Sequence, residues 1–134
     1  VLVWALGTRR DLALTLTALN RAVSRRRVTS GLIFHSDRGV EYSAYAFRAR
    51  LAALGITQSM KRPREIGDNA FIESFFHSMK AEELHGRRFD NDEQLRQALR
   101  SYIAFYNQQR LHSALCYLPP VAFERQQGLQ PCVN

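Results

Sequence analysis

The stretch Leu32-Ile33-Phe34-His35-Ser36-Asp37-Arg38-Gly39 gives the strongest indication of how this chain folds. Three apolar residues are followed by polar residues and a glycine, a pattern typical of a buried strand that ends in a turn. In α/β folds, sites form at the carboxyl ends of parallel strands. Asp37 is therefore a candidate for holding a cation in an open crevice, although an isolated Ser-Asp-x-Gly is more often only a turn and a helix cap.

Strands and helices alternate on both sides of this stretch. The expected order is strand, helix, strand, helix, strand, helix, helix, which indicates an α/β layer with parallel pairing. Apolar runs predict strands at residues 1–6, 32–37 and 56–60. Leucines at helical spacing predict the first helix over residues 11–24, and Ser43 is the expected cap of the second.

Two further helices are expected in the second half of the chain. A loop over residues 61–67 separates them from the last strand, and Asp68 is placed to cap the first of the two. The last long helix is expected to start after Asp90, with Glu93 at capping-box spacing. The chain from Leu111 on is expected to end loosely.

The length of 134 residues is enough for one domain with a core, and not enough for two. We expect that domain to span residues 1–127, followed by a tail at 128–134. No apolar run approaches the roughly 20 residues of a membrane span, so no membrane partner is expected. Cys116 and Cys132 lack the spacing of a zinc site and indicate reduced thiols in a cytoplasmic protein.

The charge balance favours a polyanionic partner. The chain has 19 Lys and Arg against 12 Asp and Glu, a net charge of +7. Basic residues cluster at 25–27, 61–64 and 87–88, where binding to phosphates would release counterions. Charge alone gives about even odds that the chain binds DNA, because many basic proteins never do.

Two other segments are candidates for chemistry. In Asp68–Phe76, Glu73 lies just off the apolar stripe of the expected helix, and a carboxylate at the edge of a core needs a partner such as a metal ion. His77 and Lys80 follow on the same face, so a surface glutamate paired with one of them is an equally good explanation. Tyr106–Leu115 carries polar groups too varied for a plain helix end, the alternative being a C-cap with a solvated basic turn.

Taken together, His35–Gly39, Asp68–Phe76 and Tyr106–Leu115 resemble the integrase core of bacterial insertion-sequence transposases. The resemblance is to the second-reading-frame product of the "insertion sequence three" group. Those proteins are similar to retroviral integrases and share an RNase H-like fold with a triad of two aspartates and a glutamate. In that family the second aspartate and the glutamate have 35 residues between them, as Asp37 and Glu73 have here.

The resemblance implies a three-layer α/β fold of the RNase H-like superfamily and a DDE transposase core, which cleaves DNA and transfers the strand. It assigns Asp37 and Glu73 as catalytic and metal-binding residues. The complete enzyme is expected to bind two Mg²⁺ or Mn²⁺ ions, because a pair of ions can activate the attacking oxygen and stabilise the leaving one. The partners implied are DNA, as transposon ends and target, and further copies of the chain; no small-molecule cofactor is implied. The residues expected to bind DNA are Lys80, Lys61, Arg62, Arg64, Arg110 and His112.

Some assignments stay open. Arg110 and His112, with the rest of Tyr106–Leu115, match a signature whose role is either structural or DNA-facing. The family's first aspartate has no counterpart, since neither Asp11 nor Asp68 matches its motif.

By the resemblance, residues 1–6 are the third strand of a five-stranded sheet. The first two strands are therefore expected to be missing, together with N-terminal helices that recognise DNA ends, as in an N-terminally truncated chain. The alternatives are a catalytically incomplete DNA-binding remnant of a decayed mobile element and an RNase H-like nuclease outside mobile elements.

Overall fold

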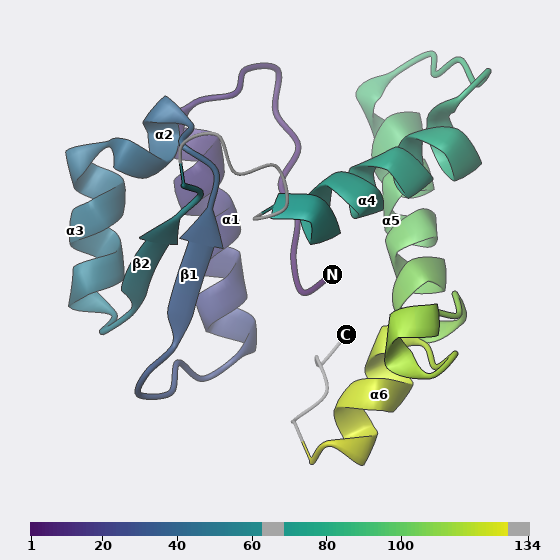
Figure 1. Ribbon diagram of the computed structural model, residues 1–134. Helices are drawn as coiled ribbons and strands as arrows, with labels where there is room; N and C mark the ends of the chain where they lie inside the picture. The colour runs from purple at the N-terminus through teal and green to yellow at the C-terminus, as the bar shows by residue number, and fades with distance from the viewer. Residues whose placement is uncertain (63–68, 129–134) are drawn as a thin grey trace. The chain divides into compact units, whose positions relative to one another are not determined.

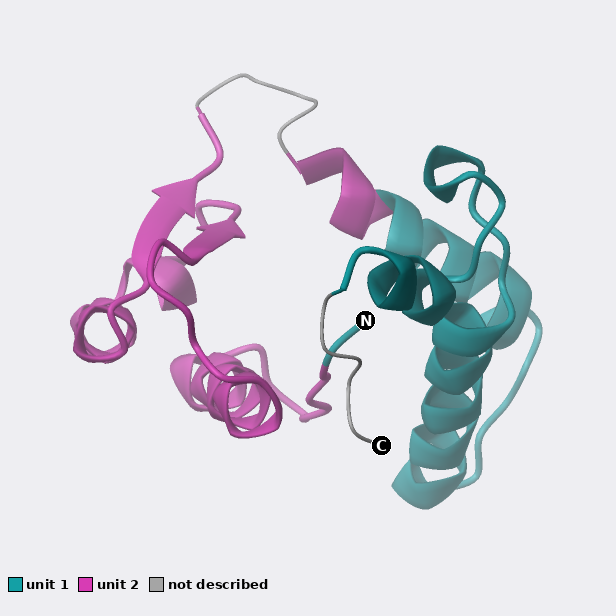
Figure 2. Cartoon of the chain, turned by 90° about the horizontal axis from the view of Figure 1, so that it is seen from below, with its two compact units in different colours: residues 1–2, 74–134 teal, residues 3–73 magenta. Residues whose placement is uncertain are grey.

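The chain is described by a computed structural model over residues 1–62 and 69–128. It forms two compact units, unit 1 from residues 1–2 and 74–134 and unit 2 from residues 3–73 (Figure 2). Each unit has buried apolar residues of its own. The predicted cap Asp68 and most of the predicted loop 61–67 lie outside the described residues.

Unit 2 is an α/β layer on a two-stranded parallel sheet. The strands pair from Ile33 opposite Thr57 to Ser36 opposite Met60. Helices lie beside the strands (Figure 1), so the predicted alternation of helices and parallel strands is confirmed for this unit. The elements are α1 (Leu12–Arg25), β1 (Ile33–Ser36), α2 (Val40–Ser43), α3 (Tyr45–Ala53) and β2 (Thr57–Met60).

The core of unit 2 joins α1, α3 and β1. The rings of Phe34 and Phe47 are 5.3 Å apart between centroids, and Phe47 is 0% exposed. Because side chains of a strand alternate between its faces, Ile33 points away from this core and is 62% exposed. The buried members of the core are Leu19, Phe47, Leu51 and Ile56.

Replacing Phe47 by Ala is expected to destabilise unit 2 by roughly 3–5 kcal/mol, because a buried ring is lost and a cavity remains. The control is Tyr45→Ala on the same helix, since Tyr45 is 86% exposed. That change is expected to alter stability by less than about 0.5 kcal/mol. Urea unfolding followed by circular dichroism measures both, and equal effects would contradict the assigned core.

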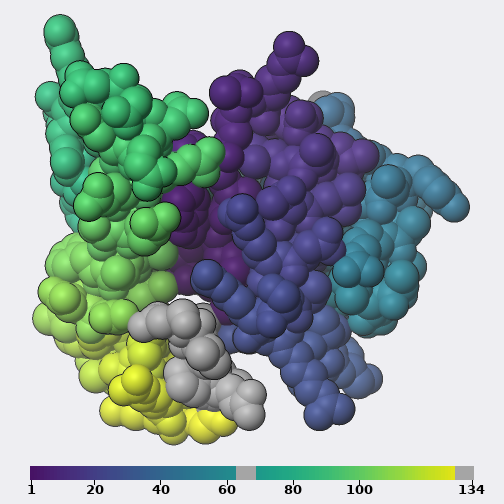
Figure 3. Space-filling view, turned by 180° about the vertical axis from the view of Figure 1, so that it is seen from behind, coloured from purple at the N-terminus to yellow at the C-terminus, as the bar shows by residue number. Residues whose placement is uncertain are grey.

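Unit 1 is helical. The ring of Tyr106 meets that of Phe75 edge-on at 5.0 Å, and α6 packs against α5, so that the two form one continuous surface (Figure 3). The buried apolar residues are Phe75, Ala98, Leu99 and Tyr102. The elements are α4 (Ala70–Met79), whose first residues belong to unit 2, a π-turn (Lys80–Leu84), α5 (Asp92–Gln108), a 3₁₀ turn (Ser113–Leu115) and α6 (Pro120–Gln126).

Helix starts follow the side chains that satisfy free backbone N–H groups. Asp11 caps α1 by accepting from the N–H of Leu14 at 2.9 Å, so that helix keeps its predicted bounds within one residue. In α5 the cap is Asn91, which accepts from the N–H of Gln94 at 2.9 Å. The helix thus begins one residue later than a cap at Asp90 predicts.

The segment Val1–Leu6 is not a strand, contrary to the prediction. A strand needs partners for its backbone groups, and within residues 1–62 and 69–128 the sheet consists of β1 and β2 alone. Side chains meet some of this demand instead: Arg21 donates to the carbonyl of Trp4 at 2.9 Å, and Asn107 donates to the carbonyl of Val1 at 2.8 Å. The predicted buried strand is therefore replaced by an irregular segment whose residues are only partly buried.

Two other local predictions are wrong. Ser43 does not cap α3, because it ends α2 and its hydroxyl donates to the carbonyl of Val40 at 3.2 Å. The residue before α3 is Ala44, which has no capping side chain. The segment after Leu111 does not end loosely, since Pro120 starts α6, where the fixed φ of proline suits the first helical position.

Candidate active site and nucleic-acid interface

Asp37 stands directly after β1, in a tight turn. Its Oδ1 accepts a hydrogen bond from the backbone N–H of Gly39 at 2.9 Å, and the residue is exposed. A Cβ atom at position 39 would lie only 3.1 Å from that oxygen. The turn therefore fixes one carboxylate oxygen at the carboxyl end of the strand, and glycine keeps the space beside it open.

Glu41 is a second carboxylate on this turn. Its side chain is 4% exposed, and its Oε1 lies 2.9 Å from Nε of Arg10. The other oxygen, Oε2, is buried without a hydrogen-bond partner and would lie 2.8 Å from a Cβ atom at position 39. Burial, followed by the charges of Asp37 and Glu41, raises the pKa of Tyr42 above its ordinary value. The end of β1 thus carries two carboxylates, of which Glu41 is paired with Arg10.

Lys61 connects the end of β1 with Glu73 through its backbone and its side chain. Its backbone N–H donates to the carbonyl of Ser36, the residue before Asp37, at 2.8 Å. Its Nζ lies 3.9 Å from Oε1 of Glu73, in the first turn of α4. The Glu73 side chain is 59% exposed, so this ion pair is weak and easily exchanged for another partner.

Lys80, Arg62 and Arg64, which are also predicted to bind DNA, differ in their structural surroundings. Lys80 is exposed and opens the π-turn, which the N–H of His85 closes by donating to the Lys80 carbonyl at 2.8 Å. Arg62 is exposed at the end of the described segment, and Arg64 lies outside the described residues.

Arg110 is bound into a polar network in unit 1. Its Nη2 lies 2.8 Å from Oε1 of Glu82, and its Nε lies 3.2 Å from each Glu82 oxygen. The hydroxyl of Tyr102 donates to Oε2 of Glu82 at 2.9 Å. The hydrogen bond from Arg110 is the main cause that lowers the pKa of Glu82, while burial and the Glu82 carboxylate raise that of Tyr102.

Aromatic contacts extend this network to His112. The guanidinium of Arg110 lies 5.7 Å from the ring centroid of Tyr106, and the rings of Tyr106 and His112 are 4.7 Å apart. Nε2 of His112 is buried without a hydrogen-bond partner. Burial, followed by the nearby charge of Arg110, lowers the pKa of His112. The C-terminal signature is thus packed into unit 1 by its side chains.

The network predicts acid lability. Because the pKa of Glu82 is lowered from its ordinary 4.5, the ion pair stabilises the fold fully above that pH and is lost as the pH falls through the lowered value. In Glu82→Gln, melting temperature is expected to fall less steeply below about pH 4.5 than in the parent chain. Thermal unfolding followed by circular dichroism tests this, and parallel curves would contradict it.

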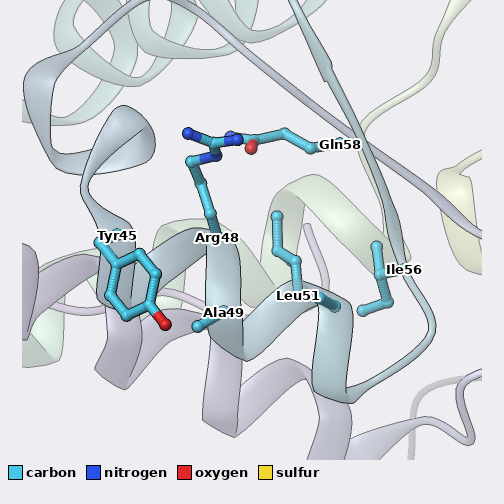
Figure 4. Close-up of a pocket in the computed structure, with 7 residues that line it drawn as sticks. Tyr45, Arg48, Ala49, Leu51, Ile56 and Gln58 are labelled. Carbon is cyan, nitrogen blue, oxygen red and sulfur yellow. The ribbon is translucent and has the colours of Figure 1, made fainter.

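A shallow cavity of about 730 Å³ lies elsewhere in unit 2. Figure 4 shows that its lining comes from α3 and from Ile56 and Gln58 on the β2 segment. None of the predicted catalytic or DNA-binding residues is among its lining residues. The candidate site is therefore the exposed region around Asp37 and Lys61, at the carboxyl ends of β1 and β2, and not this cavity.

Two descriptions of the family "Integrase core domain" match the chain, one over residues 1–65 and the other over residues 54–120. The chain therefore belongs to the integrase core domain family. Its sequence is similar to those of IS3-type transposases, as the three motifs indicate.

One relative is the "Insertion element IS600 uncharacterized 31 kDa protein" of Shigella sonnei, 42% identical over 90% of this chain and 44% of that protein. A second is "Transposase InsF for insertion sequence IS3fB" of Escherichia coli strain K12, 37% identical over 94% of this chain and 44% of that protein. The chain thus spans less than half the length of these relatives.

Solved structures show the fold. The catalytic core domain of BIV integrase matches with a TM-score of 0.65 and 17% identity, over 88% of this chain and 73% of that one. A chain of a simian T-cell lymphotropic virus intasome matches with a TM-score of 0.73 and 15% identity, over 96% and 45% respectively. The fold is therefore the RNase H-like fold of retroviral integrase cores, as the resemblance implied.

In the part of the chain that the structure describes, no helix is both long enough and apolar enough to span a membrane.

Proposed function

We propose that this chain forms part of the catalytic core of a DNA transposase that cleaves and joins DNA strands with divalent metal ions. The observation that carries the proposal is Asp37 at the end of β1, followed at the family's spacing by Glu73 in the first turn of α4. Membership of the integrase core family and the InsF relatives support it. Because the chain spans less than half of those relatives, the activity is that of a longer protein.

The donor chemistry at the Asp37 turn fits a hard divalent cation. Both Asp37 and Glu41 offer carboxylate oxygens, the ligands that Mg²⁺ prefers. Oε2 of Glu41 is buried and unsatisfied, and Gly39 leaves room beside it. Within residues 1–62 and 69–128, however, no three His, Cys, Asp or Glu side chains gather into a metal-binding group. In this proposal the described residues would supply only part of the metal centre.

Asp37 and Glu73 are the residues that would hold the metal, which when bound would activate the attacking oxygen and stabilise the leaving one. The ammonium group of Lys61 lies 3.9 Å from Oε1 of Glu73 and would exchange that partner for a DNA phosphate. Lys80 and Arg62 are exposed for phosphate contacts, which position DNA without reading its sequence. We infer that Arg110 and His112 serve the fold, since their side chains are engaged within unit 1.

The proposed partners are transposon-end and target DNA, bound by several copies of the chain in the bacterial cytoplasm. The net charge of +7 supports DNA binding. Relatives from Shigella and Escherichia support the bacterial setting, and the intasome structure supports assembly on DNA ends.

The second candidate function is non-catalytic DNA binding by a remnant of a decayed element. It is favoured by the lack of a three-ligand metal group in the described residues, together with the retained positive charge. This candidate predicts salt-dependent DNA binding without strand transfer, even in a protein that contains this chain and has the full length of its relatives.

A strand-transfer assay with labelled DNA ends and Mg²⁺ or Mn²⁺ tests the proposal in a protein of that full length. Asp37→Asn and Glu73→Gln are each expected to reduce the rate by about 100-fold or more, because a metal ligand supplies several kcal/mol of transition-state stabilisation. The control is Glu93→Gln on the exposed start of α5, which is expected to keep full activity. Full activity of Glu73→Gln would refute the assignment.

A further inference from the structure

The guanidinium group of Arg110 binds residues on both sides of the junction between α4 and the π-turn. Nη2 of Arg110 donates to Oγ of Ser78 at 3.3 Å and lies 2.8 Å from Oε1 of Glu82. Ser78 belongs to the last turn of α4 and Glu82 to the π-turn. Lys80 lies midway between Ser78 and Glu82 in sequence and is the first residue of the π-turn. Arg110 therefore binds one residue on each side of Lys80.

We propose that Glu82 is a positioning residue, which fixes the turn that presents Lys80 to DNA by binding Arg110. The inference rests on the proposed function, because it takes Lys80 to be a DNA contact. It goes further in assigning a role to a carboxylate that would otherwise repel DNA.

The contacts are strong enough to hold such a turn. A carboxylate that receives two guanidinium N–H groups forms charge-assisted bonds with fixed geometry, and the hydroxyl of Tyr102 adds a third bond to Glu82. The side chains of Arg110 and Glu82 are 28% and 39% exposed, so the strength of the pair comes from its several hydrogen bonds and not from burial. A π-turn within a helix is rare and is frequently found at functional sites.

The alternative is that Glu82 only neutralises Arg110 and has no part in DNA binding. The two explanations predict opposite changes in DNA affinity for Glu82→Gln. If Glu82 were a bystander, Glu82→Gln would remove a negative charge near DNA and strengthen binding. If Glu82 positions Lys80, the same change weakens binding although the chain becomes more positive.

Fluorescence anisotropy with a short labelled DNA duplex, measured over a series of salt concentrations, separates these outcomes. Glu82→Gln is expected to weaken binding several-fold and to lower the slope of log Kd against log salt by up to about 0.9, the value of one phosphate contact. Glu83→Gln is the matched control: it makes the same charge change in the same turn, but Glu83 pairs with Arg87 and not with Arg110. It is expected to leave binding unchanged or slightly stronger.

A double-mutant cycle ties the effect to Lys80. Lys80→Gln is expected to weaken binding by a similar factor, and Glu82→Gln is expected to add nothing in that background. Additive losses would overturn the inference while leaving the proposed DNA contact intact. No loss in Lys80→Gln would overturn both the inference and that contact.

A milder variant guards against misfolding. Tyr102→Phe removes one bond to Glu82 and keeps the pair with Arg110. It is expected to weaken binding in the same direction by a smaller factor, with an unchanged circular dichroism spectrum. If every variant that keeps a native spectrum also binds DNA as well as the parent chain, the inference is refuted.

Discussion

The parallel pairing of β1 with β2 is the interaction on which the candidate site depends. Because the register sets Ser36 opposite Met60, the next residues of the two strands, Asp37 and Lys61, emerge at the same edge. The bond from the N–H of Lys61 to the Ser36 carbonyl extends the pairing one step beyond β2. Backbone hydrogen bonds therefore place the two residues that carry the carboxylate and the cation.

The fold was predictable wherever a local pattern determines an element. Leucine spacing and Asp11 define α1, and an apolar run ending in polar residues defines β1. Residues 1–6 show the limit of such patterns, because apolarity reports burial whereas a strand also requires a partner in space. The start of α6 shows another limit: proline suggests a break, yet the same fixed φ suits the first residue of a helix.

The candidate site, like the fold, was predictable from the sequence only in part. Asp37 and Glu73 follow from motifs and their spacing, which are properties of the sequence. Glu41 and Glu82 do not, because each is distinguished only by an arginine distant in sequence, Arg10 or Arg110. Before folding, both look like ordinary glutamates near a helix start or on a helix surface. Long-range pairing therefore hides from sequence analysis the two carboxylates that shape the surroundings of the predicted residues.

The formal charge of +7 also overstates what the chain offers to DNA at any one surface, since several cations are matched within the fold. Arg10 and Arg110 each meet a carboxylate at 2.8–2.9 Å, and the planar guanidinium loses much if such a pair is broken. Lys61 lies 3.9 Å from an exposed Glu73 and loses little. For the proposed DNA contacts this difference matters more than net charge. Arginines with short pairs hold the turns in place, and a flexible ammonium group with a weak pair is free to transfer to a phosphate.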